Sequence, residues 1–534
     1  MTDFVKESVK RLDEGKLICL NRTFTTKEVF TDVACVATFL KHNGVKKGDS
    51  VIICMPNLVQ AVVALYAIIS VSAVANVVHP KIGTEGLIRI AEETETKWIF
   101  IFDRIYLKHR KELIKRGITA IICRVSDCMA GSKALRLTEP LIMCKKAVPY
   151  NATLVKPGNF DVEITGEDPA VYLHSSGTTG EPKTVVLSNK ALNELVSGIY
   201  DKVKPLDGES MLMTLPLFHG FGLGVCVHLM MTFGKIVLLP VFKAKKAVKL
   251  MHKYEINYMA VVPSMLRKLM EIKGFSGKSV RYLKNIFIGG DKPEQSLMDA
   301  VKMRLTESDS RCKVCEGYGL SETASVTHIN TDCKIGSVGS PLNGVKVKII
   351  NDGKEAEIGK DGIIYLSSPS MMSGYLNAKV NFVTDENGTK WLNTGDVGSV
   401  DKDGFLYYKG REKRMVKIGG VNIYPQETEN AANSLSEVDC SCAVRTVWNG
   451  KPALKLLVKL KRGVKLSGAL RQKLCDEISS KIMPYAVPKF IEQTDDLKMT
   501  GSGKTDYRYY EEQEPKQTDD DRRQTRERLD SGLR

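Results

Sequence analysis

The sequence lacks an apolar run of signal-peptide type at its start, where MTDFVKESVKRLDEGK carries charges of both signs. Export is therefore not expected. The 13 cysteines are scattered and odd in number, a pattern typical of reduced thiols rather than of a disulfide framework. We expect a protein of a reducing compartment, with a cytoplasmic location.

Transition-metal motifs are missing as well. None of the 8 histidines lies in an HxxxH or HExxH arrangement. Cys312 and Cys315 form a single CxxC, but no second pair of ligands follows at zinc-finger spacing. The sequence therefore predicts no transition-metal site.

The positive charge does not gather in a nucleic-acid-binding motif. The formal net charge is +16, but lysine and arginine are spread along the chain, as on a solvated surface. No aromatic-rich basic module is present, so nucleic acid is not an expected partner. The densest basic patch, Lys243 to Lys249, follows the apolar stretch KIVLL and favours an exposed helix. Peripheral membrane contact is the alternative there.

One long segment has no charge at all. From Gln60 to Val78 the apolar residues are interrupted by Ser70, Ser72 and Asn76. The second half is short and rich in valine, which is typical of a strand. This pattern indicates a buried helix followed by a buried strand rather than a membrane span.

The composition, with 43% hydrophobic and 26% charged residues, is that of a globular protein. Apolar strands alternate with amphipathic helices through the first two thirds of the chain, which predicts mostly parallel sheets covered by helices. From Gly336 to Tyr408, short strands with turn signals predict a β-rich subdomain. We therefore predict an α/β fold: a large N-terminal domain that includes this subdomain, and a small C-terminal α+β domain.

The domain boundary is expected in the basic, glycine-bearing stretch KGREKRMVKIGG. The N-terminal domain is then residues 1–409 and the C-terminal domain residues 410–512. Residues 513–534 mix opposite charges without apolar periodicity, so we expect a disordered tail.

The string YLHSSGTTGEPKTVVLSN, from Tyr172 to Asn189, carries the clearest chemical signal. An apolar strand runs into a loop of glycines and hydroxyl residues, whose backbone amides and hydroxyls can together bind phosphate oxygens. Lys183 adds a point charge. The loop does not have the spacing of a Walker motif, so ordinary P-loop chemistry is not predicted.

This loop and six further motifs resemble the adenylate-forming superfamily of acyl-CoA synthetases, peptide-synthetase adenylation domains and luciferases. The others are PLFHGFG at Pro216, IGGDKP at Ile288, EGYGLSE at Glu316, WLNTGD at Trp391, GREKRMVKIGGVNIYPQETE at Gly410 and TGSGK at Thr500. They follow in the family's order and cover nearly the whole chain before the tail.

The resemblance implies a catalytic set. Glu322 matches the family's magnesium-binding glutamate, and magnesium bridging the phosphates would neutralise developing charge. Ser321 stands where relatives usually have threonine. Lys504 matches the lysine that reaches the carboxylate and the α-phosphate in the transition state. His219 resembles the histidine that shields or gates the acyl pocket in acyl ligases.

The resemblance also implies how ATP is bound. Tyr318 would stack on adenine, Asp396 would accept hydrogen bonds from the ribose hydroxyls, and Arg411 would support it. Asp291 departs from the more usual alanine, and Thr184 departs from the usual glycine. The full implied nucleotide set is Ser175, Ser176, Gly177, Thr178, Thr179, Gly180, Lys183, Gly289, Gly290, Asp291, Tyr318, Gly319, Ser321, Asp396 and Arg411.

A second half-reaction is implied in which the small domain is mobile and swings about a hinge. Lys413 matches the hinge position. Lys417, Gly419 and Gly420 match the strand that then approaches the pantetheine of coenzyme A. Arg414 departs from relatives, which often have an acidic residue there.

The expected activity is that of an ATP-, magnesium- and coenzyme A-dependent carboxylic acid–CoA ligase. PLFHGFG contains no aspartate to hold a substrate amino group, so a medium- or long-chain fatty acid is favoured over an amino acid. An aryl acid remains open, as does a carrier-protein phosphopantetheine in place of free coenzyme A. The non-enzyme alternative is a nucleotide- or acyl-binding sensor on a catalytically dead scaffold.

Overall fold

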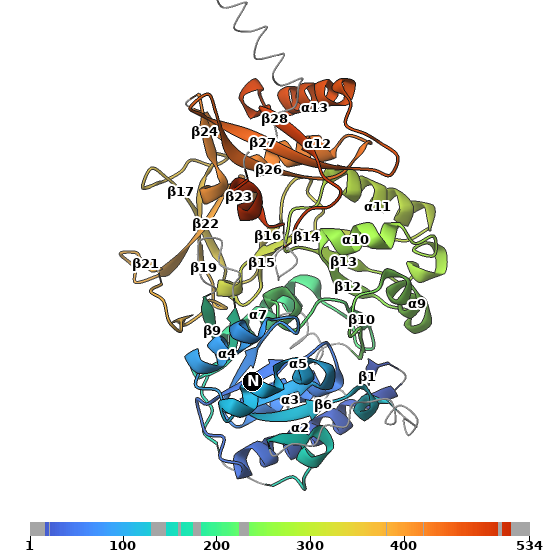
Figure 1. The fold of residues 1–534 in the computed structure, drawn as a ribbon, viewed down its shortest axis with the longest axis vertical. Coiled ribbons are helices and arrows are strands. Elements are labelled where there is room, and N and C mark those ends of the chain that lie inside the picture. The colour runs from blue at the N-terminus through green and yellow to red at the C-terminus, as the bar shows by residue number, and fades with distance from the viewer. Residues whose placement is uncertain are drawn as a thin grey trace, which may run out of the picture. The chain divides into compact units, whose positions relative to one another are not determined.

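A computed structural model describes residues 16–20, 22–129, 146–158, 162–174, 183–223, 234–380, 382–419, 421–499 and 505–513 (Figure 1). The chain divides into two compact units. The first comprises residues 1–292, 301–346 and 367–391, and the second comprises residues 293–300, 347–366 and 392–534. The domain boundary at residue 409 stays a prediction.

The first unit contains two sheets. The N-terminal sheet has the strand order β20-β9-β8-β4-β3-β5-β6-β7. Its strands are β3 (Ser50–Cys54), β4 (Val74–Val77), β5 (Trp98–Phe102), β6 (Thr119–Cys123), β7 (Ala147–Pro149), β8 (Pro169–His174), β9 (Thr184–Ser188) and β20 (Gly374–Tyr375). The strands from β8 to β7 in this order are parallel, while β9 and β20 form an antiparallel edge.

The central sheet has the order β16-β15-β14-β13-β12-β10-β11-β1-β2. Its strands are β1 (Lys16–Cys19), β2 (Arg22–Thr25), β10 (Ser210–Met213), β11 (Lys235–Leu238), β12 (Tyr258–Val261), β13 (Asn285–Ile288), β14 (Lys313–Gly319), β15 (Val326–Ile329) and β16 (Ser340–Pro341). The run from β14 to β1 is parallel, and β2, β15 and β16 are antiparallel. The predicted mostly parallel architecture is confirmed.

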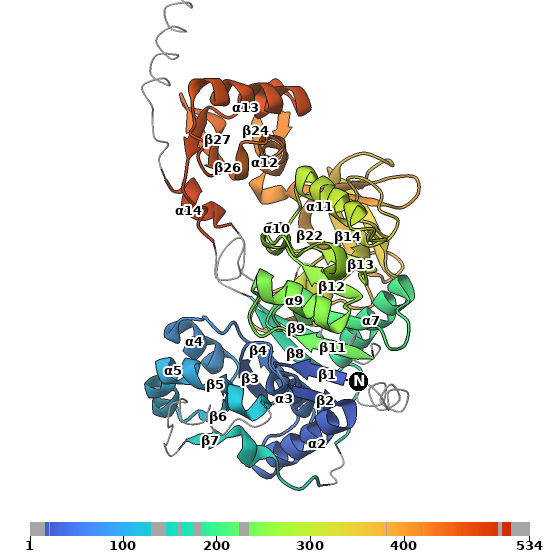
Figure 2. The ribbon, with the colours of Figure 1, turned by 90° about the vertical axis from the view of Figure 1, so that its right-hand side faces the viewer.

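Helices cover both faces of the N-terminal sheet. The connection from β3 to β4 and the one from β4 to β5 run in opposite directions across the sheet, so right-handed crossovers place their helices on opposite faces. Figure 2 shows α4 and α5 on one side of these strands and α2 and α3 on the other.

The helices and short 3₁₀ turns that connect the strands of the two sheets are α2 (Thr26–His42), α3 (Val59–Ser70), α4 (Thr84–Glu93), α5 (Asp103–Lys115), η1 (Val125–Cys128), η2 (Tyr150–Thr153), α7 (Asn189–Val203), α9 (Ala244–Tyr254), α10 (Pro263–Met270), η3 (Gly277–Ser279), α11 (Gln295–Glu307) and η4 (Ser321–Thr323).

Two of these elements answer questions raised by the sequence. The uncharged segment is a buried helix, α3, followed by a buried strand, β4, as predicted. The basic patch forms α9, which buries Ala247, Val248 and Met251 and follows β11, the pattern of an amphipathic surface helix. Among the described residues, no helix combines the length and apolarity that crossing a membrane requires.

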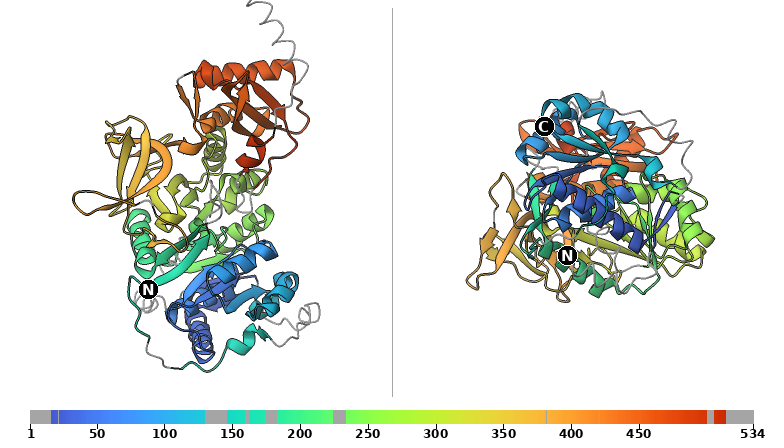
Figure 3. Two further views of the ribbon diagram at one scale, coloured as in Figure 1. Left: turned by 60° about the vertical axis from the view of Figure 1, so that its left-hand side comes forward. Right: turned by 90° about the horizontal axis from the view of Figure 1, so that it is seen from below.

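The second unit begins with the predicted β-rich subdomain, coloured yellow to orange in Figure 3. Its strands are β17 (Lys346–Asn351), β18 (Lys354–Glu355), β19 (Gly362–Ser367), β22 (Lys390–Val400) and β23 (Leu406–Arg411), while β21 (Phe382–Thr384) belongs to the first unit. The order is β18-β17-β19-β22, with β23 paired to β22.

The rest of the second unit is a small α+β body. Its elements are η5 (Glu412–Arg414), β24 (Val416–Ile418), β25 (Val421–Ile423), α12 (Pro425–Asn433), β26 (Val438–Trp448), β27 (Lys451–Leu460), α13 (Gly468–Lys481), η6 (Pro484–Ala486), β28 (Phe490–Gln493) and α14 (Tyr507–Glu511). Helices α12 and α13 pack with the β26-β27-β28 sheet (Figure 2). The core between them includes Ala432, Leu454, Leu456 and Leu474.

Candidate active site

The predicted site residues of the first unit follow the carboxyl ends of parallel strands. In the central sheet β14, β13, β12 and β10 lie in this order, so the loops that follow them meet along one edge. His219 follows β10, Gly289 follows β13, and Glu322 follows β14. Ligands of open α/β sheets bind at this edge.

The loop that carries His219 is fixed by a residue that sequence reasoning missed. The amide of Asn57, which is 2% exposed, donates to the Leu215 carbonyl at 2.7 Å and accepts from the Leu217 N–H at 3.1 Å. A Cβ on Gly220 would lie 3.1 Å from the Ala324 carbonyl oxygen. The two loops are therefore in close contact, and His219 lies beside the turn after β14.

The loop after β13 approaches the same place. A Cβ on Gly289 would lie 3.3 Å from both the Gly317 carbonyl oxygen and the Phe221 ring. Gly290 has a φ of +83°, a left-handed conformation that favours glycine. Asp291 is exposed, and its carboxylate accepts from the Lys292 N–H at 2.9 Å.

The end of β14 carries Tyr318, Gly319, Ser321 and Glu322. Tyr318 is 8% exposed. Gly319 packs so tightly against the backbone of Ser325 that a Cβ would overlap the carbonyl oxygen there, at 1.8 Å. The backbone then turns through η4, which begins at Ser321 and brings Glu322 out of the strand.

The Glu322 carboxylate is oriented by another residue that the sequence did not single out. The hydroxyl of Tyr375 donates to Glu322 Oε1 at 2.9 Å, and the Lys183 ammonium lies 4.6 Å from the centroid of the same ring. The structure thus brings the predicted phosphate lysine and the predicted metal-binding glutamate to one tyrosine. A carboxylate held in this way is a suitable oxygen ligand for Mg²⁺.

The predicted phosphate loop itself, from Ser175 to Gly180, lies outside the described residues. The strands on either side of it, β8 and β9, are described, and they are joined. His174 and Thr184 are register partners in the antiparallel β8–β9 pair, and their side chains hydrogen-bond at 3.2 Å between Thr184 Oγ1 and His174 Nδ1. The departure from the usual glycine at Thr184 therefore supplies a contact.

This contact belongs to a buried polar network that fixes the histidine tautomer. Asn76 Nδ2 donates to Thr94 Oγ1 at 3.1 Å, so its Oδ1 faces His174 and accepts from Nε2 at 2.7 Å. Nδ1 is then left to accept from the Thr184 hydroxyl. Burial, with a smaller effect of the Arg89 charge, lowers the pKa of His174 to about 4. The ring is neutral at physiological pH.

The second unit brings Asp396 and Arg411 together, as the resemblance implied. They are register partners in the β22–β23 pair. Arg411 Nε lies 2.9 Å from Asp396 Oδ1, and Arg411 Nη1 donates to the Thr394 carbonyl at 3.0 Å. Asp396 is 1% exposed, so its carboxylate is held in place by a charged partner.

The predicted hinge lies within the second unit. Lys413 is in η5, Lys417 is in β24, and Gly419, with a φ of +59°, turns the chain toward β25. A Cβ on Gly419 would lie 2.8 Å from the Tyr485 ring. Gly420 lies outside the described residues.

Arg414, next to the predicted hinge, is anchored. Its Nη2 lies 2.7 Å from Glu429 Oε1 and donates to the Ala443 carbonyl at 3.0 Å, while the guanidinium carbon lies 3.4 Å from the centroid of the Tyr507 ring. Burial opposes its charge, but the Glu429 carboxylate outweighs this and raises the pKa of Arg414.

Lys504 lies outside the described residues, but the chain on either side is fixed. Met499 and Thr505 form an antiparallel bridge. The side chain of Lys455, which is 1% exposed, donates to the carbonyls of Tyr510 and Gln513 at 2.8 Å each. These contacts tie the segment that follows Lys504 to β27.

Glu316 is a titratable residue within a recognised motif that received no role from the sequence. Burial raises its pKa to about 7, and the charges of Lys292 and Lys302 offset this only in part. No pattern of residues would have indicated its protonation, because the shift arises from packing.

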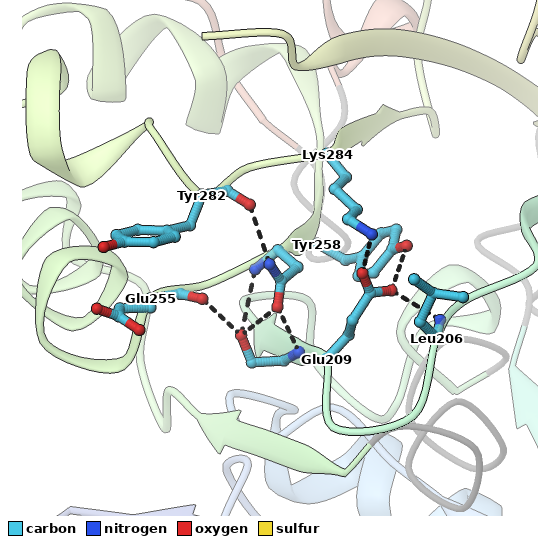
Figure 4. Close-up of polar contacts among 8 residues, drawn as sticks. Leu206, Glu209, Glu255, Tyr258, Tyr282 and Lys284 are labelled. Carbon is cyan, nitrogen blue, oxygen red and sulfur yellow. Dashed lines mark hydrogen bonds and ion pairs between the residues drawn. The ribbon is translucent and has the colours of Figure 1, made fainter.

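A second polar cluster lies at the amino ends of the strands of the central sheet (Figure 4). The Glu209 carboxylate pairs with Lys284 and accepts from the Tyr258 hydroxyl at 2.7 Å and from the Leu206 N–H at 2.8 Å. Burial, reinforced by this carboxylate, raises the pKa of Tyr258. These residues are at the amino ends of β10, β12 and β13, so they stabilise the sheet and lie away from the site loops.

Comparisons with known proteins show the family of this chain. Residues 5–376 match the AMP-binding enzyme family, and residues 427–504 match the AMP-binding enzyme C-terminal domain. A long-chain-fatty-acid–CoA ligase of Bacillus subtilis (strain 168) is 28% identical over 519 residues, covering 92% of this chain and 90% of the relative. The 4-coumarate–CoA ligase-like 8 protein of Arabidopsis thaliana is 26% identical over 521 residues, covering 95% and 90%.

Solved structures show the same fold. O-succinylbenzoate coenzyme A synthetase from Bacillus subtilis, in complex with ATP and magnesium ion, superposes with a TM-score of 0.78 at 23% identity, covering 95% of this chain and 98% of that one. ATP-bound MatB from Rhodopseudomonas palustris gives a TM-score of 0.82 at 20% identity, with 95% and 98% covered.

The fold is that of an α/β protein with a large N-terminal and a small C-terminal domain. The chain belongs to the AMP-binding enzyme family. It is an AMP-forming acid–thiol ligase.

Proposed function

We propose that this chain joins a medium- or long-chain fatty acid to coenzyme A. ATP and the acid first give an acyl-adenylate and pyrophosphate, and the thiol of coenzyme A then displaces AMP to give the acyl-CoA. The observation that carries the proposal is the meeting of Lys183 and Glu322 at Tyr375, because the first step needs a phosphate cation and a metal-binding carboxylate close together.

The residues of the first unit fit the adenylation step. Bound at the Glu322 carboxylate, Mg²⁺ would neutralise charge on the phosphates. Lys183 binds phosphate oxygens together with the Ser175–Gly180 loop. Tyr318 packs against adenine, and His219 borders the acyl pocket.

The second unit supplies the ribose site and the moving parts. Asp396, held by Arg411 at 2.9 Å, accepts from the ribose hydroxyls. Lys504 donates to the carboxylate and the α-phosphate during adenylation. Rotation about Lys413 then exchanges the Lys504 loop for Lys417 and Gly419 in the coenzyme A step.

The substrate and the acceptor are the finer parts of the proposal. Relatives named long-chain-fatty-acid–CoA ligase and 4-coumarate–CoA ligase-like 8 match at similar identity, 28% and 26%, so an aryl acid is the second candidate. A carrier-protein phosphopantetheine is the alternative acceptor. We expect the enzyme to act in the cytoplasm.

The test is pyrophosphate release from ATP and Mg²⁺ over a panel of fatty, aryl and amino acids, with and without coenzyme A, followed by mass detection of the products. An acyl-CoA from fatty acids supports the proposal. Release with aryl acids only would show that the substrate is an aryl acid. An acyl-adenylate that persists in the presence of coenzyme A would favour a carrier-protein phosphopantetheine as the acceptor. Lys504→Ala should slow adenylation by about two to three orders of magnitude, by analogy with the loss of one preorganised donor.

A further inference from the structure

Tyr375 is fixed close to Lys183 by backbone hydrogen bonds. It is the last residue of β20, which pairs with β9 at the edge of the N-terminal sheet. The Ser373 N–H donates to the Val186 carbonyl, and the Leu376 N–H donates to the Thr184 carbonyl, at 2.9 Å each. Because Thr184 directly follows Lys183, the tyrosine cannot shift without moving the end of the phosphate loop.

The same short segment is tied to the turn that carries Glu322. The Met372 N–H donates to the Glu322 carbonyl at 2.8 Å. Ser370 is 4% exposed, and its hydroxyl donates to the Thr323 carbonyl at 3.1 Å. Residues 370–376 therefore join two loops that are far apart in the sequence.

The side chain of Tyr375 contacts residues of both loops. Its hydroxyl donates to Glu322 Oε1 at 2.9 Å. Its ring faces the Lys183 ammonium at 4.6 Å, within the range of a cation–π interaction. The hydroxyl restricts rotation of the carboxylate, and the ring restricts the position of the ammonium.

We propose that Tyr375 is a positioning residue for the magnesium–ATP step: its hydroxyl orients the Glu322 carboxylate for the metal ion, and its ring holds Lys183 beside it. This inference rests on the proposed function. Partners that orient a metal ligand typically contribute 10- to 100-fold to metal affinity or activity. The two contacts are separable, because phenylalanine keeps the ring and leucine keeps neither.

The first experiment is a Mg²⁺ titration of pyrophosphate release at saturating ATP and acid. For Tyr375→Phe we expect the half-saturating Mg²⁺ concentration to rise about tenfold, with kcat at saturating Mg²⁺ and KM for ATP within about twofold of wild type. Tyr375→Leu should also raise KM for ATP several-fold, because Lys183 loses the ring.

The chain offers a matched control. Tyr407, in β23, donates its hydroxyl to Asp401 Oδ2 at 3.1 Å, a tyrosine–carboxylate bond in the second unit. Tyr407→Phe should leave the Mg²⁺ dependence unchanged. An equal rise in this control, or a wild-type Mg²⁺ dependence in Tyr375→Phe, would overturn the proposal.

A second readout does not depend on catalysis. Mn²⁺ binding in the presence of ATP and without acid can be followed by electron paramagnetic resonance, and Tyr375→Phe should bind Mn²⁺ about tenfold more weakly than wild type. If wild type binds Mn²⁺ with ATP while none of the acids tested supports pyrophosphate release, the proposed function fails. In that case the Mn²⁺ affinities still test the role of Tyr375. Equal Mn²⁺ affinity in the two proteins refutes the positioning role.

Discussion

The hydrogen bond between Thr184 and His174 should hold the two ends of the predicted phosphate loop together. Thr184→Val removes the hydroxyl and keeps the shape of the side chain. Thr184 is 4% exposed and His174 Nδ1 accepts its hydroxyl at 3.2 Å, so the variant leaves a partly buried acceptor unpaired. Such a loss costs about 1–3 kcal/mol, and about 2 kcal/mol corresponds to roughly a 30-fold change in an opening equilibrium.

The effect is local, so the assay should be local as well. Hydrogen exchange measured by mass spectrometry on peptides that cover β8 and β9 should be roughly 30-fold faster in Thr184→Val. KM for ATP should rise as well, because β8 and β9, which flank the predicted phosphate-binding residues, are then less firmly joined. Thr184→Ser keeps the hydroxyl and is the matched control. Wild-type exchange rates in Thr184→Val would refute the reasoning.

Acid should weaken the same network. The folded pKa of His174, about 4, lies below the unfolded value near 6.5. The unfolded chain therefore takes up a proton first as the pH falls. The stability contributed by the neutral ring is complete above about pH 6.5 and is lost between about pH 6.5 and pH 4, by roughly 3 kcal/mol in total. Urea unfolding of wild type and His174→Gln across this range measures the difference, and parallel curves would contradict the assignment.

Three further outcomes are expected. Glu429 is 2% exposed, and Arg414→Leu removes the charged partner of its carboxylate. The variant should therefore lower the free energy of unfolding by about 3–5 kcal/mol. A loss below about 1 kcal/mol in urea titrations would contradict this. Glu316 has a folded pKa of about 7, above the unfolded value, so stability should fall as the pH rises from about 4.5 to 7. Thermal unfolding at pH 5 and pH 8 measures this fall, and Glu316→Gln should abolish it. Asp396→Asn should raise KM for ATP at least about tenfold, because one charge-assisted contact to the ribose is lost; an unchanged KM would remove Asp396 from the ribose site.

The architecture could be predicted because its signals are periodic. The uncharged Gln60–Val78 segment has the residues of a buried helix and a buried strand, and the structure has α3 and β4 there. Alternating strands and helices likewise indicated parallel sheets. These predictions depend on local pattern and burial, which are present in one sequence.

Contacts between distant segments were predictable only where a family motif named both partners. Asp396 and Arg411 are 2.9 Å apart, and the resemblance implied their cooperation. Tyr375 and Asn57 carry no motif, and their roles arise from strand pairing and loop packing that no spacing indicates. The protonation of Glu316 and the tautomer of His174 depend on burial and partners, which only coordinates supply.

The anchoring of Arg414 has a mechanical consequence. A hinge residue moves a domain as one body only when the residues next to the hinge are held firmly to that domain. Directly after Lys413, the guanidinium is joined to α12 through Glu429, to β26 through the Ala443 carbonyl and to α14 through the ring of Tyr507. If the chain turns at Lys413 as we propose, α12, β26 and α14 are linked through Arg414 to the residue directly after the hinge, so these contacts favour their moving together.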